Sequence, residues 1–243
     1  MSGPVLGLTV LGCDGSWAGP GGAGSGYVVA SGGTRVVVDT GPGTFSRLQQ
    51  EVDPAAIDAV VISHHHPDHW SDLLMIDAHA RWALHRSGIP VYAPAGVAER
   101  AGLSGSASFD WRPVTGGDSI TVGALGITFR RTDHSFETLA VRIDGPVSAL
   151  GYSADTGPGW PLADLGSGLD LVLCEATYTT EHEGTARHMS GRQAGRQARQ
   201  ARARRLVLTH RWPTVEASAV GAEARAEFDG PVEHAEPGKG FEL

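Results

Sequence analysis

The residues with the clearest chemistry lie together, in the run His64-His65-His66-Pro67-Asp68-His69. The apolar segment before them, residues 58–63, indicates a buried strand. Because side chains at i and i+2 leave a strand end in the same direction, His64 and His66 can bind one metal ion together. Asp68 and His69 follow the proline turn and can face a second ion. This set of imidazole and carboxylate groups suits zinc or a similar divalent metal.

The plain alternative for this run is a polar surface loop that is rich in histidine. A His-tag, however, has no Pro-Asp insertion and does not follow a buried strand. A His-x-His-x-Asp-His run at a strand-to-helix junction resembles the signature of the metallo-β-lactamase superfamily. That resemblance implies further ligands at defined places downstream.

Three later residues match the ligands that the resemblance implies. His134 is a lone histidine after a strand-like segment, and His210 ends a late strand-like segment. Asp155 lies in residues 151–157, which resemble the family's Gly-Tyr-Ser-Gly-Asp-Thr element with its shared carboxylate. The implied site has His64, His66 and His134 on one metal, Asp68, His69 and His210 on the other, and Asp155 as the bridge.

Asp39 ends another apolar run and sits where the family has an aspartate beside a metal-binding histidine. Such histidines usually donate their other N–H group to a carboxylate or a carbonyl. A turn aspartate at a strand end is the equal alternative for this residue.

A pair of metal ions in such a site defines the chemistry. Two ions about 3.5–4 Å apart hold a bridging water and lower its pKa, so that hydroxide is available near neutral pH. They also stabilise negative charge on an attacked phosphoryl or carbonyl oxygen. We therefore expect a metal-dependent hydrolase with two divalent ions and no organic cofactor. Zinc is the first expectation, with manganese and iron as alternatives.

Two segments resemble the phosphodiesterase branch of the superfamily. Residues 173–177 are similar to its Glu-Ala-Thr element, and residues 188–191 to its histidine segment before a helix. The resemblance implies that Glu175 orients His188, and that His188 protonates the leaving alkoxide. Such proton transfer typically contributes about 10²–10⁴-fold. Together with Asp68, these two residues form the expected catalytic group; a solvated loop histidine beside a strand-end glutamate is the alternative.

The length of one connection bears on the substrate. The tRNA-processing enzymes of this branch carry a long Gly-rich arm between the third ligand and the bridging carboxylate. Residues 135–154 have room for two strands and a turn only, which favours a small substrate.

Longer segments resemble a narrower group, the actinobacterial cyclic-nucleotide phosphodiesterases called atypical class II. The match includes residues 8–16, 134–143 and 226–232 and spans nearly the whole chain. It implies that hydroxide bridging two metals opens a 3′,5′-cyclic nucleotide, such as cyclic AMP, to the 5′-monophosphate. Ala140 and Ala154 depart from glycines that are usual in this group, which leaves the substrate open.

Other functions therefore remain as alternatives. The first is a tailoring hydrolase of another small phosphoester, a lactone or a thioester. An RNase Z-type nuclease and a non-catalytic, metal-bound partner protein are the others. Four tryptophans near the site segments can either stack on a nucleobase or pack in the core: Trp17, Trp70, Trp160 and Trp212.

The order of elements that must position these residues predicts an α/β fold. Strands and helices alternate in two mirrored halves, as in the αβ/βα sandwich of the metallo-β-lactamases, with two mixed sheets flanked by helices. The length of 243 residues and the 41% hydrophobic content fit a single domain over residues 1–243. We expect strands near residues 5–11, 26–30, 34–39, 57–62, 90–93, 119–123, 126–132, 138–143, 147–152, 170–175 and 205–209, and helices near 71–86, 190–203 and 214–226.

Composition indicates the compartment and the partners. The chain has no apolar run long enough to span a membrane, and residues 1–4 lack the regions of a signal peptide. Cys13 and Cys174 fit a reducing cytoplasm better than a disulfide framework. The net charge of −8 argues against stable nucleic-acid binding, and the resemblance implies a small phosphoester as the partner. Relatives of this kind often dimerise, and a homodimer stays open.

One basic stretch, residues 187–205, stands apart from this acidic chain. Arg192, Arg196 and Arg199 fall at helical spacing and share a face. Either this face attracts a phosphate or it is an ordinary solvated helix surface; the second is our expectation.

Overall fold

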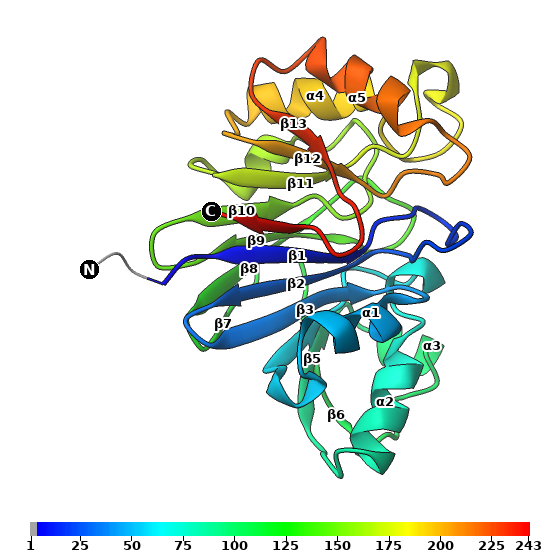
Figure 1. Ribbon diagram of the computed structural model, residues 1–243, viewed down its shortest axis with the longest axis vertical. Helices are drawn as coiled ribbons and strands as arrows, with labels where there is room; N and C mark the ends of the chain where they lie inside the picture. The colour runs from blue at the N-terminus through cyan, green and yellow to red at the C-terminus, as the bar shows by residue number, and fades with distance from the viewer. Residues whose placement is uncertain (1–3) are drawn as a thin grey trace.

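Two seven-stranded sheets form the centre of the molecule. A computed structural model describes residues 4–243, and Figure 1 shows the strands stacked between two groups of helices. The first sheet has the order β14-β1-β2-β3-β4-β5-β6 and the second the order β13-β12-β11-β10-β9-β8-β7. This is the predicted αβ/βα sandwich.

All eleven predicted strands are present, with bounds close to the predicted residues, and the two sheets contain three further strands. Those of the first sheet are β1 (Gly7–Gly12), β2 (Gly26–Ser31), β3 (Thr34–Thr40), β4 (Ala59–Val61), β5 (Ile89–Ala93), β6 (Phe109–Pro113) and β14 (Gly240–Glu242). Those of the second sheet are β7 (Ser119–Val122), β8 (Leu125–Arg131), β9 (Leu139–Asp144), β10 (Ala149–Tyr152), β11 (Leu171–Glu175), β12 (Leu206–Thr209) and β13 (Val232–His234).

The two sheets repeat one plan, which makes both of them mixed. In the first sheet β14, β1, β2 and β3 pair antiparallel, and β3 to β6 pair parallel. In the second sheet β7 to β10 pair antiparallel, and β10 to β13 pair parallel. Binding sites in such folds lie beyond the carboxyl ends of the parallel strands, and the residues of interest follow β4, β10 and β12 there.

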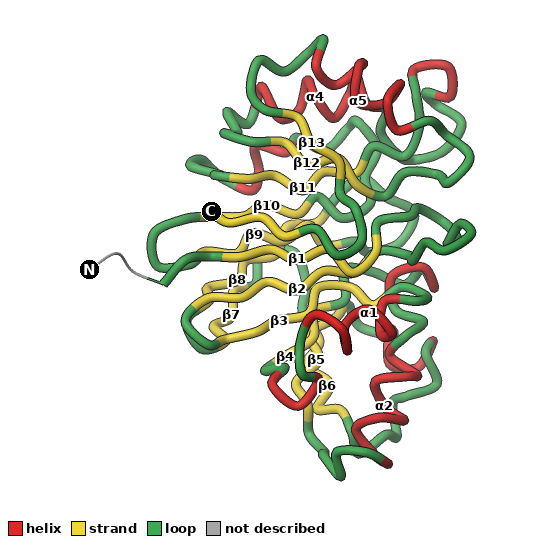
Figure 2. Tube along the Cα trace, viewed as in Figure 1, coloured by secondary structure: helices red, strands yellow, loops and turns green. Residues whose placement is uncertain are grey.

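Helices cover the outer faces of the sheets. Figure 2 shows them in red, in one group beside β11 to β13 and in another beside β3 to β6. The helices are α1 (Thr44–Glu51), α2 (Leu73–Trp82), α3 (Val97–Arg100), α4 (Gly191–Gln200) and α5 (Ala217–Arg225), with short 3₁₀ turns at Pro54–Ala56, Pro67–His69, Leu162–Leu165 and Thr180–His182.

Alternation along the strands divides the apolar side chains among three cores. Val36 and Val38 of β3 lie in the core between the sheets, whereas Val37 packs beneath the first group of helices. Val172 of β11 packs with Ala194 of α4 in the core beneath the second group. This period of two is what a strand with both faces covered requires.

Five elements of the structure have no counterpart in the sequence prediction: α1, α3, β6, β13 and β14. Helix α1 buries only Thr44 and Leu48, so it lacks a strong apolar stripe. Strand β6 is largely exposed or half-buried beyond Phe109, and it ends in a proline. Strands β13 and β14 have three residues each, too few for a periodic pattern to stand out.

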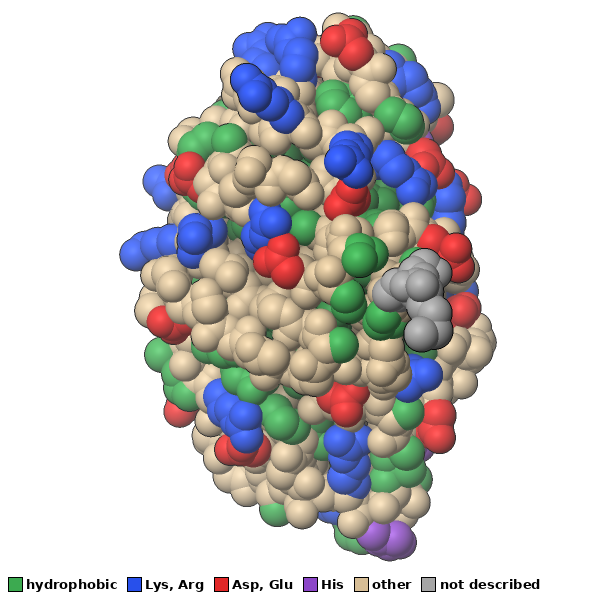
Figure 3. All heavy atoms as spheres, turned by 90° about the vertical axis from the view of Figure 1, so that its left-hand side faces the viewer, with side chains coloured by type: hydrophobic (Ala, Val, Ile, Leu, Met, Phe, Trp, Pro, Cys, Tyr) green, Lys and Arg blue, Asp and Glu red, His purple; other side chains and the backbone are tan. Residues whose placement is uncertain are grey.

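The basic stretch forms α4, and acidic residues pair with its arginines. Arg192 lies 2.6 Å from Glu183, and Glu227 accepts hydrogen bonds from both Arg196 and Arg199. The face of the molecule in Figure 3 likewise has basic side chains interspersed with acidic ones. The helix surface is therefore a solvated one and does not present unpaired arginines for a phosphate. Within residues 4–243, no helix is long and apolar enough to cross a membrane.

Candidate dinuclear metal centre

The structure brings all seven predicted ligands together at the carboxyl ends of the strands. Their potential ligand atoms form groups whose members lie within 4.8 Å of one another. One group contains His64, His66, His134 and Asp155, and another contains Asp68, His69 and His210. This division is the one that the sequence predicts.

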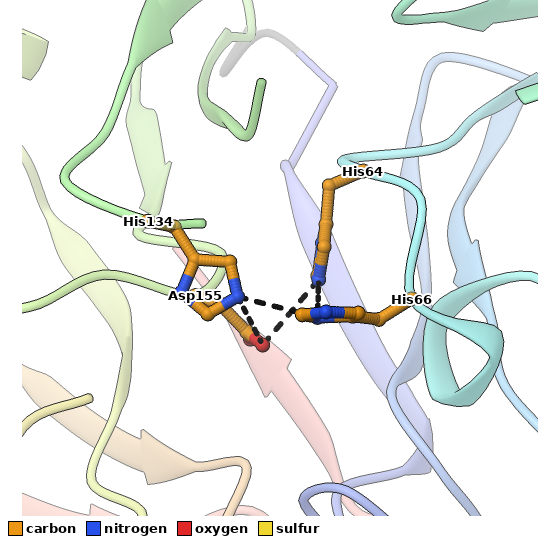
Figure 4. Close-up of side chains that lie close together, drawn as sticks. All are labelled: His64, His66, His134 and Asp155. Atoms are coloured by element: carbon orange, nitrogen blue, oxygen red, sulfur yellow. Dashed lines mark hydrogen bonds and ion pairs between the residues drawn. The ribbon is translucent and has the colours of Figure 1, made fainter. Parts of the chain in front are cut away.

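The first group is shown in Figure 4, where three imidazoles and one carboxylate point toward a common centre. His64 Nε2 lies 3.0 Å from His66 Nδ1, and His134 Nε2 lies 3.2 Å from the same atom. The Oδ2 atom of Asp155 is 3.5 Å from His64 Nε2 and 3.8 Å from His134 Nε2. Four donor atoms thus surround one point.

The second group shares Asp155 with the first. Its Oδ1 atom is 3.2 Å from His69 Nε2 and 3.3 Å from His210 Nε2. The Oδ2 atom of Asp68 closes this group, at 3.2 Å from His210 Nε2 and 3.5 Å from His69 Nε2. Because the two oxygens of Asp155 face different groups, this carboxylate has the geometry of a bridge.

Hydrogen bonds behind the first histidines set their tautomers. The Ser63 hydroxyl donates to Asp39 Oδ2, so its oxygen is left to accept from His64 Nδ1, 3.0 Å away. His69 Nδ1 donates to the same Asp39 oxygen at 2.8 Å. Asp39 therefore contacts a cluster histidine as the resemblance implies, and in the neutral rings these bonds leave the Nε2 lone pairs of His64 and His69 facing the cluster.

The histidines that follow strands of the second sheet, His134 and His210, are likewise oriented by hydrogen bonds at Nδ1. His134 Nδ1 donates to the carbonyl oxygen of Arg187 at 3.1 Å. The Thr177 hydroxyl donates to Glu175, so its oxygen accepts from His210 Nδ1 at 3.0 Å. Again the Nε2 atoms that face the centre carry lone pairs.

The unshared lone pairs and unpartnered polar atoms of the cluster indicate that its donor atoms fit divalent cations. The Nε2 atoms of His64 and His134 both turn lone pairs toward His66 Nδ1 at hydrogen-bond distance, and because this nitrogen can carry only one proton, a cation would satisfy the lone pair that is left over. His69 Nε2 and Asp155 Oδ1 are buried and, although 3.2 Å apart, make no hydrogen bond with any of residues 4–243. Buried polar atoms in proteins rarely lack partners, and metal ions would satisfy both.

The ionisation of the cluster agrees with this fit. Burial lowers the pKa of His64 well below its ordinary value and lowers that of His66 to about 4, so both rings are neutral ligands at pH 7. Burial also lowers the pKa of His69, but the carboxylates of Asp155 and Asp68 outweigh it and raise this pKa well above the usual range. Negative charge is thus concentrated beside His69, where a bound cation would balance it.

Backbone strain gathers at the same place. Four of the six non-glycine residues with positive φ in the described chain belong to the cluster or adjoin it: Ser16 (φ 64°), Asp39 (57°), Ala154 (49°) and His210 (54°). Left-handed conformations are costly for residues with a Cβ atom and persist where the surroundings enforce them. At Ala154 this φ gives a reason for the glycine that is usual in the resembling group.

Glu175 and His188 also meet, at the edge of the cluster. His188 Nδ1 donates to Glu175 Oε1 at 3.0 Å. Three further donors fix the buried Glu175 side chain: the amides of Thr156 and Met189 and the hydroxyl of Thr177. Burial lowers the pKa of His188, but the charge of Glu175 and their hydrogen bond outweigh it and raise the pKa to about 9.

A hollow of about 270 Å³ opens onto the cluster, and its lining residues are Ser16, His66, Pro67, Asp68, Asp155 and His188. It joins the donor groups to the Glu175–His188 pair in one small space. The arrangement can therefore hold two cations, a small substrate and a proton donor at neighbouring positions.

Comparison with known proteins agrees with this site. A family model described as "Beta-lactamase superfamily domain" matches residues 34–211. The chain belongs to this superfamily. Residues 34–211 include all seven clustered donors together with Glu175 and His188, and the fold is that of its metal-dependent hydrolases.

Individual proteins also match along most of the chain. Rv1339 of Mycobacterium tuberculosis is 38% identical over 240 residues, which cover 93% of this chain and 88% of Rv1339. A ribonuclease Z of Kineococcus radiotolerans is 31% identical over 83% of this chain and 82% of its own length. The YhfI protein of Bacillus subtilis is 30% identical over 95% of this chain and 97% of its own. Its crystal structure, described as a metallo-β-lactamase fold protein, superposes with a TM-score of 0.92 over 98% of this chain and 100% of YhfI.

Sequence reasoning missed the residues that orient the cluster. Ser63 directly precedes His64, and Thr177 follows Glu175 by two positions. Their closeness in sequence to predicted site residues was the only indication that their hydroxyl groups belong to the site. Tyr152 donates to Asp39 Oδ2 at 2.8 Å across 113 positions of sequence. Phe136, 38% exposed, lies 5.1 Å from the His66 ring between ring centroids.

The four tryptophans separate into two pairs. Trp70 and Trp160 are 9% and 7% exposed and pack in the cores beneath the helices. Trp17 is 44% exposed, and its ring centroid lies 6.2 Å from that of Trp212. Only the second pair is placed where a ligand could touch it.

Proposed function

We propose that this protein is a dinuclear metal-dependent phosphodiesterase that opens a 3′,5′-cyclic nucleotide to the nucleoside 5′-monophosphate. The observation that carries the proposal is the fixed Glu175–His188 pair beside the cluster. His188 has a ring nitrogen within 4.8 Å of ligand atoms of Asp155 and His210, and it lines the same small hollow.

The pair suits a leaving group that needs a proton. Glu175 receives four hydrogen bonds and holds His188 through Nδ1, so the ring cannot turn and its Nε2 atom is left for the substrate. A ribose oxygen leaves as a strongly basic alkoxide, and a positioned acid speeds such a step by about 10²–10⁴-fold. A lactone or thioester whose leaving group is already good gains much less from it.

The cluster would hold two cations in the division that the geometry favours. His64, His66 and His134 would bind one, Asp68, His69 and His210 the other, and Asp155 both. Two bound divalent ions supply hydroxide at neutral pH and stabilise charge on the attacked phosphoryl group. We propose zinc, with manganese or iron as alternatives that the same ligands accept. Asp68 belongs to the proposed catalytic group because it would hold one ion and it lines the hollow.

The size of the site favours a small phosphodiester. Strands β9 and β10 are joined by residues 145–148 alone, so no protruding arm for a tRNA lies between His134 and Asp155. The hollow of about 270 Å³ and the net charge of −8 also disfavour a long polyanion. The ribonuclease Z relative supports phosphodiester chemistry. The free thiols Cys13 and Cys174 favour the cytoplasm as the place of action.

His188→Ala tests the proposal with two substrates that differ in the leaving group. For 3′,5′-cyclic AMP we expect kcat to fall about 10²–10⁴-fold. For bis(p-nitrophenyl) phosphate, whose p-nitrophenolate leaves without a proton, we expect a loss of less than about tenfold. His79→Ala, a histidine of α2 outside the cluster, serves as the matched control.

Metal content must be measured on the same preparations. Two ions per chain in both variants, with the substrate-dependent loss, supports the acid role. Loss of metal from His188→Ala would mean that His188 is a ligand instead. Equal losses on both phosphoesters would refute proton donation. Turnover of a lactone but of neither phosphoester by the wild-type protein would favour an acyl hydrolase.

A further inference from the structure

An exposed aromatic wall stands beside the second group of donors. The Trp17 and Trp212 rings lie 6.2 Å apart between centroids, with their planes 32° from parallel. The ring of Tyr178, a fully buried residue, also lies near Trp212, with 5.5 Å between the ring centroids. Trp17 is the outermost ring of this series, and 44% of it is exposed.

Hydrogen bonds tie this wall to the metal cluster. The Ser16 amide donates to Asp68 Oδ2 at 2.8 Å, and the indole N–H of Trp212 donates to Ser16 Oγ at 3.0 Å. Trp212 follows the cluster residue His210 by two positions, and its amide donates to the Thr177 carbonyl at 3.0 Å. Trp17 therefore adjoins Ser16, which is hydrogen-bonded to the proposed ligand Asp68, and Trp212 lies two positions after the proposed ligand His210.

The backbone leaves this wall little freedom. A Cβ atom at Gly15 would lie 2.4 Å from the carbonyl oxygen of His210, so only glycine allows the loop to approach so closely. Ser16 has a φ of 64°, and the Gly15 amide donates to the Arg211 carbonyl at 2.9 Å. The loop is fixed against the segment that follows β12, which sets the backbone position from which the Trp17 side chain extends.

The exposed indole of Trp17 lies next in sequence to a residue that lines the hollow, which suggests contact with a ligand. Ser16 lines the hollow, and Trp17 is the next residue, so a ligand whose phosphate lies at the cluster can extend a ring over Trp17. Nucleobases stack on such surfaces whatever their hydrogen-bonding pattern. In a cyclic nucleotide, ribose joins the phosphate to such a base.

We propose that Trp17, supported by Trp212, is the surface on which the nucleobase of the substrate stacks. This inference rests on the proposed function and identifies the part of the site that selects nucleotides over other phosphodiesters. Phe136 is the competing ring, on the His66 side of the cluster. The guanidinium of Arg100 already lies over it, 5.3 Å from its centroid, whereas the described chain lays no cation over Trp17.

The test compares a substrate that has a base with one that has none. We would measure kcat/KM for 3′,5′-cyclic AMP and for the cyclic phosphate of 1,3-propanediol, with wild type, Trp17→Ala, Trp17→Phe and Phe136→Ala. For Trp17→Ala we expect the ratio of the two values to fall about 5- to 150-fold, the range of one base–aromatic stack, chiefly through KM for cyclic AMP. Trp17→Phe should restore most of the ratio, and Phe136→Ala should leave it within about threefold.

A binding measurement separates failure of this inference from failure of the proposed function. Quenching of tryptophan fluorescence by adenosine 5′-monophosphate requires no turnover, and Trp17→Phe should remove most of it. If the wild-type protein cleaves neither phosphodiester, and Trp17→Phe removes the quenching seen in the wild type, the proposed function is wrong but Trp17 still binds the base. The role of Trp17 would be overturned if the ratio of the two kcat/KM values were unchanged in Trp17→Ala. It would also be overturned if the ratio fell in Phe136→Ala instead.

Discussion

Asp39→Asn should weaken metal binding without touching a proposed ligand. In the folded chain Asp39 Oδ2 accepts from Ser63 Oγ, His69 Nδ1 and Tyr152 Oη, each at 2.8 Å, and Oδ1 accepts from the Ser63 amide at 2.7 Å. Asparagine has the same shape and tolerates the φ of 57° at this position. The substitution therefore changes hydrogen bonding and charge and leaves the backbone alone.

The size of the effect follows from these four bonds. An asparagine offers one acceptor oxygen, and if it takes the place of Oδ2, its NH₂ group confronts the Ser63 amide. An unpaired buried donor costs about 1–3 kcal/mol of folding stability. His69 loses a charged partner, and removing such a partner lowers metal affinity about 10–100-fold. We expect the weaker affinity at the ion that His69 binds.

Competition with a chromophoric chelator measures this affinity, and urea unfolding of the metal-free protein measures the stability. Asp58→Asn is the matched control, because Asp58 is exposed and accepts from a single backbone amide, that of Arg35. Metal affinities of Asp39→Asn within twofold of wild type would show that Asp39 does not support the metal centre.

Two further predictions concern the metals themselves. Asp155→Ala removes the carboxylate whose oxygens face both donor groups, so the metal content by elemental analysis should drop well below two ions per chain; unchanged loading would refute the bridge. Exhaustive chelation should lower the melting temperature, because an ion at 100 times its Kd stabilises the folded state by about 2.7 kcal/mol. Equal melting curves for loaded and chelated protein would mean that the buried donors do not bind metal in the folded state.

The donor set was predictable because its signals are local. His64 and His66 need only a strand and a period of two, and Asp68 and His69 need only a turn after them. The later donors each end a strand, and family spacing locates them. The structure adds what spacing does not contain, namely that the two oxygens of Asp155 face different groups.

The supporting shell was not predictable from such signals. Tyr152 reaches Asp39 from the opposite sheet, and nothing near either residue in the sequence indicates that contact. The tryptophans show the same limit, since the sequence around Trp70 and Trp17 does not reveal that one packs beneath α2 and the other is exposed. Exposure depends on the packing of elements that are far apart in the chain.

The boundaries of the longer elements were largely predictable, whereas several short elements were missed. The sequence places the start of α4 near residue 190, and Ser190 with Gln193 forms the capping box that sets it at Gly191. Short or half-exposed pieces such as β6 and α1 give no periodic signal, because their stability comes from the sheet and the core they join.

The central claim is that two metals and this site hydrolyse a cyclic phosphodiester. The most direct test incubates protein of measured metal content with 3′,5′-cyclic AMP in H₂¹⁸O and analyses the product by mass spectrometry. We predict adenosine 5′-monophosphate with one ¹⁸O in its phosphate, formed at a rate that follows the fraction of chains with two bound ions. Fully loaded protein that leaves 3′,5′-cyclic AMP intact would contradict it.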